Sequence, residues 1–249
     1  MFNFFKRNTS PAHSNLTNIY QDIHSHILPG IDDGSPDIET SLALIKGLNS
    51  LGIHKAIATP HIIGDMYRNT PESINNALQK VRMACAEAEI NMELSAAAEY
   101  MLDDHFMRLL RGKQPLLTMG KNLLLTELSY VTPPDNLEEM SFEMITAGYQ
   151  PIMAHPERYF FYHKNYESFF RLKELGFLIQ VNLLSLTGHY GVQAARAAKF
   201  IFEKNLADLV GTDMHHTRHL KLLSKKENLS MFTKYLGDKI YNNLSEIAS

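Results

Sequence analysis

Short β-prone runs alternate with amphipathic stretches along the whole chain, and this alternation limits the fold more than any other feature. Seven runs are predicted as strands, at residues 16–23, 53–59, 92–98, 122–126, 149–154, 177–181 and 207–212. The stretches that follow them carry apolar residues three or four positions apart, which is typical of helices. Because each helix returns the chain to the same end of the sheet, the pattern predicts a parallel α/β arrangement.

The helices are predicted at residues 38–51, 71–91, 103–111, 137–147, 166–175 and 192–205, and through most of 220–249. No repeat, low-complexity tract or linker divides the chain. Single α/β barrels are typically about 250 residues long, so a chain of 249 residues suits one domain. We therefore expect one domain over residues 19–249, preceded by an N-terminal tail over residues 1–18.

Residue types that bind metals follow six of the seven predicted strands. They are His24, His61, Glu99, Glu127, His155 and Asp213. His26 and His215 stand two positions further along from the first and last of these, and alternate residues of an extended segment share one face. The carboxyl ends of the strands gather on one face of a parallel barrel. The sequence therefore predicts a distorted (β/α)7 TIM-like barrel with a metal cluster at the C-terminal ends of its strands.

Composition and charge exclude several classes of protein. A net charge of -3 provides no basic surface for nucleic acid. No apolar run approaches the ~20 residues that span a bilayer, so no transmembrane segment is expected. Cys85 is the single cysteine, which rules out an intramolecular disulfide and leads us to expect a reducing, cytoplasmic compartment.

Motifs of other hydrolase and phosphate-binding families are missing from the sequence. A cysteine-based tyrosine phosphatase needs an arginine six positions after its cysteine, but Asn91 stands six positions after Cys85. The chain has no Gly-rich Walker loop around Gly112 and Lys113, and no Gly-x-Ser-x-Gly nucleophile elbow. These absences favour chemistry based on the predicted metal cluster.

Seven short motifs, taken in order, resemble those of the PHP (polymerase and histidinol phosphatase) superfamily. They are His24-Ser25-His26, Asp32-Asp33-Gly34, Thr59-Pro60-His61, Glu99, Glu127, His155-Pro156-Glu157-Arg158 and Asp213-Met214-His215. Within the superfamily they are most similar to the bacterial manganese-dependent protein-tyrosine phosphatases of the CpsB/YwqE type, which belong to capsule and exopolysaccharide loci. The resemblance runs from residue 20 to residue 219, most of the chain.

The resemblance implies the PHP fold and a cluster of three divalent metal ions. The implied ligands of the first ion are His24, His26, Glu99 and Asp213. Glu99 also binds the second ion, together with Glu127 and His155. The third ion is held by Asp33, His61 and His215. Imidazole and carboxylate donors without a thiolate suit manganese, iron or zinc and disfavour a closed structural zinc site. Manganese is expected from the resemblance, with iron and zinc as alternatives.

Arg158 and Arg218 each stand three positions after a predicted histidine ligand. A guanidinium can hold two phosphate oxygens at once, so both are candidate catalytic residues. The resemblance supports an arginine at position 158, whereas the loop that carries Arg218 departs in spacing from the relatives. Asp32 and His216 are candidates for supplying a proton, and the choice stays open.

The resemblance implies one-step hydrolysis of phosphotyrosine, in which a metal-bridging hydroxide attacks phosphorus in line while the metals and arginines hold the phosphoryl group. The implied partner is a phosphotyrosine protein, with a bacterial tyrosine kinase of capsule or exopolysaccharide synthesis as the expected substrate. Two alternatives stay open. One is a small-molecule phosphatase of the same superfamily, of the histidinol-phosphate type. The other is a catalytically silent binding module with the same fold.

Overall fold

A computed structural model describes residues 16–247 of the chain. Residues 1–15, most of the predicted tail, lie outside the described part. Leu16 already belongs to the core, because its side chain is buried and its backbone N–H donates to the carbonyl oxygen of Leu51 at 2.8 Å. The described chain is therefore attached to the end of the first helix from its first residue.

Six parallel strands form the main sheet, in the order β2-β4-β5-β6-β7-β8. Their bounds are β2 His61–Ile62, β4 Glu99–Met101, β5 Leu123–Glu127, β6 Gln150–Ala154, β7 Leu178–Asn182 and β8 Leu209–Gly211. A second, two-stranded parallel sheet pairs β1 (Lys55–Ala58) with β3 (Glu93–Ala96). The parallel α/β class is thus confirmed, and within the described residues the regular main sheet ends at β2 and β8 without closing on itself.

The strands predicted at 53–59 and 92–98 correspond to β1 and β3, and each is followed by a further short strand, β2 or β4, that was not predicted. β1 and β2 are separated by a Thr-Pro pair, and proline cannot donate a hydrogen bond to a ladder. β3 and β4 are separated at the same level, so His61 and Glu99 begin strands rather than follow them. Hydrogen bonding continues across the break, because the N–H of Glu99 donates to the carbonyl oxygen of Pro60 at 3.1 Å.

The strand predicted at residues 16–23 is wrong, because this segment forms only single β-bridges. It bridges to Tyr241 at Ile19 and to β1 at Asp22, and just beyond it Ser25 bridges to Met214 after β8. The apolar residues that suggested a strand, Ile19 and Ile23, are buried in two different apolar clusters. Their burial comes from packing and not from pairing along an extended ladder.

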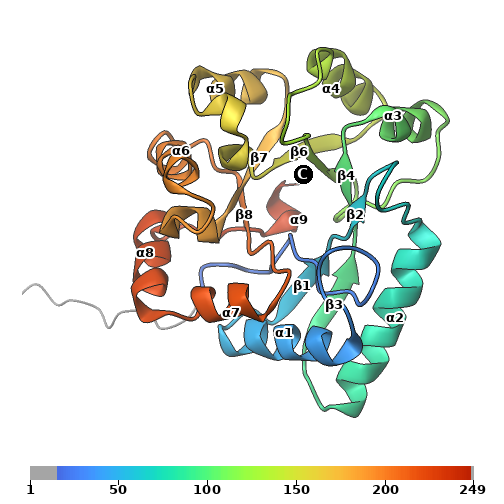
Figure 1. Ribbon diagram of the computed structural model, residues 1–249, viewed down its shortest axis with the longest axis vertical. Coiled ribbons are helices and arrows are strands. Elements are labelled where there is room, and N and C mark those ends of the chain that lie inside the picture. The colour runs from blue at the N-terminus through green and yellow to red at the C-terminus, as the bar shows by residue number, and fades with distance from the viewer. Residues whose placement is uncertain (1–15, 248–249) are drawn as a thin grey trace, which may run out of the picture.

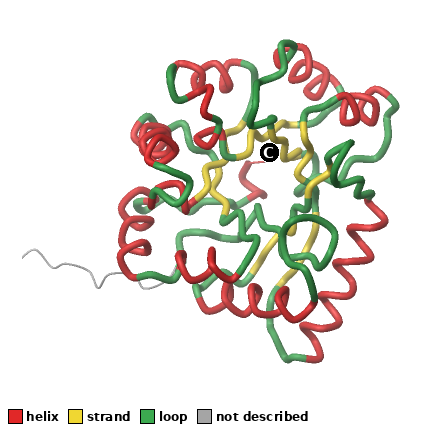
Figure 2. Tube along the Cα trace, in the orientation of Figure 1, coloured by secondary structure: helices red, strands yellow, loops and turns green. Residues whose placement is uncertain are grey.

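Helices surround the strands, as Figure 1 shows by element and Figure 2 shows by type of structure. Their bounds are α1 Ile38–Ser50, α2 Pro71–Glu87, α3 Asp104–Arg111, α4 Leu137–Thr146, α5 Glu167–Glu174, α6 Val192–Glu203, α7 Thr217–Leu223, α8 Lys226–Leu236 and α9 Leu244–Ile247. The stretch predicted as mostly helical, 220–249, contains most of α7 together with α8 and α9. None of the described helices combines the length and apolar character that a membrane span requires.

Two clusters of apolar side chains fill the fold. The larger cluster lies between the strands and the surrounding helices. The smaller one consists of strand residues such as Ile57, Leu125 and Ile152, with Leu244 of α9 added to them. Because successive side chains of a strand point to opposite faces, five of the strands (β1, β5, β6, β7 and β8) contribute to both clusters, whereas β2, β3 and β4 contribute to the larger one only. Figure 1 shows α9 within the outline of the strands, where it covers the smaller cluster.

Candidate metal centre

The structure brings the nine predicted metal ligands together, although His61 and Glu99 begin the short strands β2 and β4 and do not stand at C-terminal strand ends. They form four overlapping groups, in each of which one donor atom of every member lies within 4.8 Å of the others. The groups are His26, Asp33, His61 and His215; His24, His26 and Asp213; His24, Glu99 and His155; and His61, Glu99 and Glu127. The donors come from residues 24–33 before α1, from β2, β4 and β5, and from the loops after β6 and β8.

Glu99 lies at the centre of the cluster, and its buried carboxylate faces four imidazoles. Oε2 of Glu99 lies 3.1 Å from Nε2 of His24, 3.3 Å from Nε2 of His26 and 3.2 Å from Nδ1 of His61. Oε1 lies 3.0 Å from Nε2 of His155. The two oxygens of one carboxylate thus face different sets of donors, which is the arrangement that a bridging ligand needs.

Four buried polar atoms of the cluster residues have no hydrogen-bond partner. Three of them face other donors of the cluster, namely Nδ1 of His61, Oε2 of Glu99 and Oε1 of Glu127, whereas Nδ1 of His155 lies on the side of its ring away from Glu99. The His61 nitrogen is only 2.8 Å from the Glu127 oxygen, yet the pair does not form a hydrogen bond. Unpaired buried polar atoms are costly, and a divalent cation among them would satisfy all three. Imidazole and carboxylate donors without a thiolate suit manganese, iron or zinc, so the residues present fit a metal cluster.

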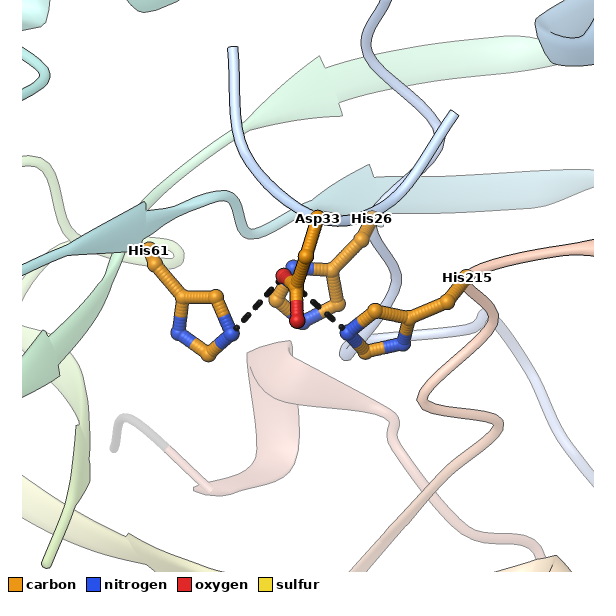
Figure 3. A group of neighbouring side chains, drawn as sticks. All are labelled: His26, Asp33, His61 and His215. Carbon is orange, nitrogen blue, oxygen red and sulfur yellow. Dashed lines mark ion pairs between the residues drawn. The ribbon is translucent and has the colours of Figure 1, made fainter. Parts of the chain in front are cut away.

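Asp33 completes the part of the cluster that faces solvent (Figure 3). Its side chain reaches between two imidazoles, with Oδ1 3.4 Å from Nε2 of His61 and 3.6 Å from Nε2 of His215. The side chain of Asp33 is 53% exposed, whereas that of Glu99 is fully buried. A hydrogen bond from His215 contributes most to lowering the pKa of Asp33 to about 2. Asp33 therefore stays anionic over the whole physiological range.

Two neighbour relations differ from the ligand sets that the resemblance implies. His26 belongs to the group around Asp33 as well as to the group around Asp213, and its ring stacks on that of His215 with centres 3.9 Å apart. Glu127 approaches His61, while His155 belongs to a different group. Packing between distant segments decides these neighbours. The division of the ligands among individual ions therefore stays a prediction.

The carboxylates shift the pKa values of two imidazoles upward, those of the buried His24 and the partly buried His215. Burial alone would lower the pKa of His24, but Glu99 and Asp213 raise it to about 10. Burial likewise opposes the shift of His215, whose pKa is raised to about 9 chiefly by Asp213. The anionic cluster thus attracts positive charge. Protons supply this charge on the imidazoles, and a divalent cation would displace those protons.

Asp32 supports the cluster without joining it. Its Oδ2 lies 2.8 Å from Nδ1 of His26, the ring nitrogen that points away from Glu99. The same oxygen accepts a hydrogen bond from the backbone N–H of His61 at 3.2 Å, and Oδ1 accepts one from Gly34 at 2.9 Å. A carboxylate in this position fixes the orientation of a metal-binding histidine. Both oxygens of Asp32 are thus engaged within the protein, and this argues against a role of Asp32 as proton donor.

A second chain of hydrogen bonds orients His24 and Asp213. Nδ1 of His24 lies 2.8 Å from Oε1 of Gln180. The amide of Gln180 donates to Asn182 at 2.9 Å, and the amide of Asn182 donates to Oδ2 of Asp213 at 2.7 Å. Sequence patterns did not identify Gln180 and Asn182 as part of the site. Their signal is a pair of polar residues at alternate positions of an apolar strand, which places both on one face.

Arg158 lines the opening of the cluster. Its Nη1 donates to Oδ2 of Asp213 at 2.6 Å, and its guanidinium carbon lies 4.2 Å from the ring centre of Tyr190 and 5.1 Å from that of Tyr130. Two aromatic faces and a carboxylate together hold the cation in one orientation. With Asp33, Tyr190 and Asp213, it lines a cavity of about 250 Å³. The two tyrosines were missed because nothing local in the sequence links them to Arg158.

Arg218 is placed differently from Arg158. It lies exposed in the first turn of α7. Among the described residues its side chain forms no hydrogen bond and no ion pair, and it does not line the opening. The next residue, His219, is buried, and its Nδ1 lies 3.1 Å from the carbonyl oxygen of Asp213. The structure thus places only one of the two predicted arginines against the cluster.

Two residues of the cluster adopt the left-handed backbone conformation, His155 with a φ of 35° and Asp213 with a φ of 49°. Residues other than glycine rarely adopt it, and the cost is about 1–3 kcal/mol each. Hydrogen bonding holds Asp213 in place, because its N–H donates to the carbonyl oxygen of His24 at 2.8 Å. Backbone strain of this kind concentrates at functional sites.

Comparisons with known proteins agree with this geometry. The family model for capsular polysaccharide synthesis proteins of the CpsB/CapC type matches residues 20–246. The tyrosine-protein phosphatase YwqE of Bacillus subtilis is 28% identical over 227 residues, which are 91% of this chain and 89% of that protein. The tyrosine-protein phosphatase CpsB of Streptococcus pneumoniae is 27% identical over 201 residues, which are 78% of this chain and 82% of that protein.

A solved structure shares the fold, with a TM-score of 0.75 and 26% sequence identity over 90% of this chain and 96% of that chain. It comes from crystal structures of YwqE from Bacillus subtilis and CpsB from Streptococcus pneumoniae, which are described as unique metal-dependent tyrosine phosphatases. The family match includes every residue of the candidate metal centre. The chain therefore belongs to the CpsB/CapC family of capsular polysaccharide synthesis proteins.

Proposed function

We propose that this protein is a metal-dependent protein-tyrosine phosphatase, which hydrolyses phosphotyrosine to tyrosine and inorganic phosphate. Its main support is the convergence of nine imidazole and carboxylate side chains around the buried Glu99, with Arg158 at their opening. The shared family and the phosphatases named among the relatives support the same activity. A phosphate monoester is the substrate class that would suit this site once it held divalent ions, with an arginine at its mouth.

The cluster is proposed to hold three divalent ions, with manganese expected and iron or zinc as alternatives. The proposed ligands are His24, His26, Asp33, His61, Glu99, Glu127, His155, Asp213 and His215. Bound divalent ions would supply positive charge against the phosphoryl oxygens and would lower the pKa of water toward neutrality. Glu99 is the proposed bridging ligand because each of its oxygens faces a different set of imidazoles.

Arg158 is proposed to bind and orient the phosphoryl group. Tyr130 and Tyr190 hold its guanidinium in place, so its remaining N–H groups can fork onto two phosphate oxygens. A tyrosine leaves as a phenolate whose ordinary pKa is about 10. It therefore needs less protonation than an alkoxide, and the reaction makes little demand on a general acid. Arg218 is proposed for a lesser role at the surface beside the opening.

The finer architecture proposed here is a distorted (β/α)7 barrel in which segment 22–26 takes the place of the missing strand. Hydrogen bonds on both sides of this segment support closure. The N–H of His26 donates to Met214 at 2.9 Å on one side, and the N–H of Ile57 donates to Asp22 at 2.8 Å on the other. Closure of this kind would explain why the histidines near the start of the chain meet the ligands near its end.

The proposed partner is a phosphotyrosine protein, with a cognate bacterial tyrosine kinase of capsule or exopolysaccharide synthesis as the physiological substrate. The capsule-synthesis family supports this choice. We place the reaction in the cytoplasm, where the single, buried Cys85 would stay reduced.

Phosphate release tests the proposed function directly. Manganese-loaded protein is assayed with a phosphotyrosine peptide and, in parallel, with histidinol phosphate. His26→Ala should lower peptide turnover at least about 100-fold, because it removes a ligand shared by two groups. His54→Ala, an exposed histidine outside the cluster, is the matched control and should leave turnover unchanged.

The other results of this assay would overturn the proposed function. Turnover of histidinol phosphate alone would identify a small-molecule phosphatase. No turnover of either substrate, with bound manganese verified by metal analysis, would identify a binding module with the same fold.

A further inference from the structure

A larger cavity, of about 740 Å³, lies between the loop that follows β2 and helix α3. Its lining includes four apolar side chains and two arginines, which are Ile62, Tyr100, Leu109, Leu116, Arg68 and Arg108. None of the nine proposed metal ligands lines it. The cavity is therefore separate from the opening at Arg158.

The cavity and the metal centre lie back to back across two strands. β2 and β4 are neighbours, and their register pairs His61 with Glu99 and Ile62 with Tyr100. Successive side chains of a strand point to opposite faces. The first pair accordingly belongs to the metal centre, whereas the second pair lines the cavity.

The loop at residues 63–70 separates the two sites. Tyr67 stacks on the ring of His61, with ring centres 5.6 Å apart and planes 14° from parallel, whereas the next residue, Arg68, lines the cavity. The N–H of Gly64 donates to Oδ2 of Asp103 at 3.0 Å, which ties the loop to the start of α3. A polypeptide bound at the metal centre would cross this one loop to reach the cavity.

The two arginines of the cavity can receive an acidic ligand. Both are exposed, and within the described residues neither forms an ion pair. Arg68 uses its Nε in a hydrogen bond to the carbonyl oxygen of Gly64 at 2.7 Å, which leaves its other N–H groups for a ligand. Asp65 is the single acidic residue among the described side chains of the lining. The positive charge of the two arginines favours an acidic ligand, and the apolar side chains of the lining favour an apolar one. The cavity therefore suits a segment that is both acidic and apolar.

We propose that this cavity binds an acidic and apolar segment of the substrate polypeptide itself, a few residues away from the phosphotyrosine. This rests on the proposed function, because it requires that the substrate of the metal centre be a peptide. Packed layers lie about 10 Å apart and an extended chain advances about 3.3 Å per residue, so the segment lies roughly three to five residues from the phosphotyrosine. The cavity would thereby favour protein substrates over small phosphate esters.

Paired peptides test this specificity site. One phosphotyrosine peptide carries Glu-Leu-Glu at three to five residues on both sides of the phosphotyrosine, and its partner carries Gln-Ser-Gln there. Free phosphotyrosine reports on the metal centre alone. The test variant is Arg68→Glu with Arg108→Glu. The control is Lys80→Glu with Lys121→Glu, which makes the same change of charge at two exposed positions outside the cavity.

The wild-type protein and the control should prefer the acidic peptide. The arginine variant should raise the KM of that peptide about tenfold, the effect expected when two exposed charge pairs become repulsive. Its kcat and its turnover of free phosphotyrosine should not change. A fluorescein-labelled acidic peptide with unphosphorylated tyrosine should bind the metal-free protein, by fluorescence anisotropy, and should lose affinity in the arginine variant only.

Equal KM values for the two peptides with the wild-type protein would overturn the inference, and so would an equal loss in the control variant. These results are distinguishable from failure of the proposed function. If free phosphotyrosine is turned over, the metal centre works as proposed, and the peptide comparison alone judges the cavity. If it is not turned over, the anisotropy measurement still decides whether the cavity binds the acidic segment.

Discussion

Replacing Asp32 by asparagine should weaken metal binding without removing a ligand, whereas the same change at Asp33 should remove one. The two residues are adjacent in sequence but face different atoms. Asp32 contacts the outer nitrogen of His26 at 2.8 Å, while Asp33 points toward Nε2 of His61 and His215. The two variants therefore separate a supporting carboxylate from a ligating one.

The size of the Asp32→Asn effect follows from the contacts that change. The Asp32 carboxylate accepts from the backbone N–H of Gly34 as well as interacting with His26. An asparagine can offer its oxygen to one of these donors only, and its amide then faces the other. Loss of such an outer partner typically costs 10–100-fold in metal affinity, which is about 1.4–2.7 kcal/mol.

Isothermal titration calorimetry with manganese on chelator-treated protein measures both effects. Asp32→Asn should keep the number of bound ions and lower their affinity. Asp33→Asn should reduce the number of bound ions by one. Asp238→Asn, an exposed aspartate outside the four ligand groups, is the control and should match the wild-type protein. If Asp32→Asn binds manganese within twofold of the wild-type affinity, or if Asp33→Asn loses no ion, the assigned roles are wrong.

Three further predictions concern the arginines, the loop and the protons. Arg158→Ala should lower kcat/KM for a phosphotyrosine peptide about 100-fold, whereas the exposed Arg218→Ala should lower it less than about threefold; similar losses in both would contradict the geometry. Gly34→Ala should lower Tm by roughly 3–10 °C in a thermal melt, because the added methyl group would collide with a facing backbone carbonyl and overpacking costs about 1–3 kcal/mol. The pKa values of His24, about 10, and of His215, about 9, keep both rings protonated at pH 7. Manganese binding should therefore release protons and tighten as pH rises toward 9, and calorimetry in buffers of different ionisation enthalpy would detect no proton release if this is wrong.

Much of the fold could be predicted because its signals are local. The stretches predicted as helices at 71–91, 103–111 and 192–205 correspond to α2, α3 and α6, since apolar spacing along the chain reports directly on helical faces. The failures occurred where local signals mislead. Segment 16–23 has the apolar residues of a strand, but it packs without a ladder. The short strands β2 and β4 were not predicted, because runs of two and three residues carry no apolar pattern of their own.

Eight of the nine residues of the candidate site could be predicted from the pattern of strands, because a parallel sheet brings its strand ends to one face, whereas Asp33 was implied by the family resemblance alone. That rule needs only the order of the elements and the residue type after each of them. It cannot say which of two neighbouring aspartates turns inward, and Asp32 and Asp33 are alike in every local respect. It also cannot say which imidazole meets Glu127, a contact that His61 makes from another strand.

The chemistry of the centre was thus present in the amino-acid sequence, as histidines and carboxylates placed after strands, with no thiolate among them. Its geometry depended on tertiary contacts. The stacking of Tyr130 and Tyr190 on Arg158 and the exposure of Arg218 come from segments that the sequence does not connect. The physical reason is that backbone periodicity reports which face a side chain occupies, whereas packing between distant segments sets the distances of a few ångströms on which ligation and catalysis depend.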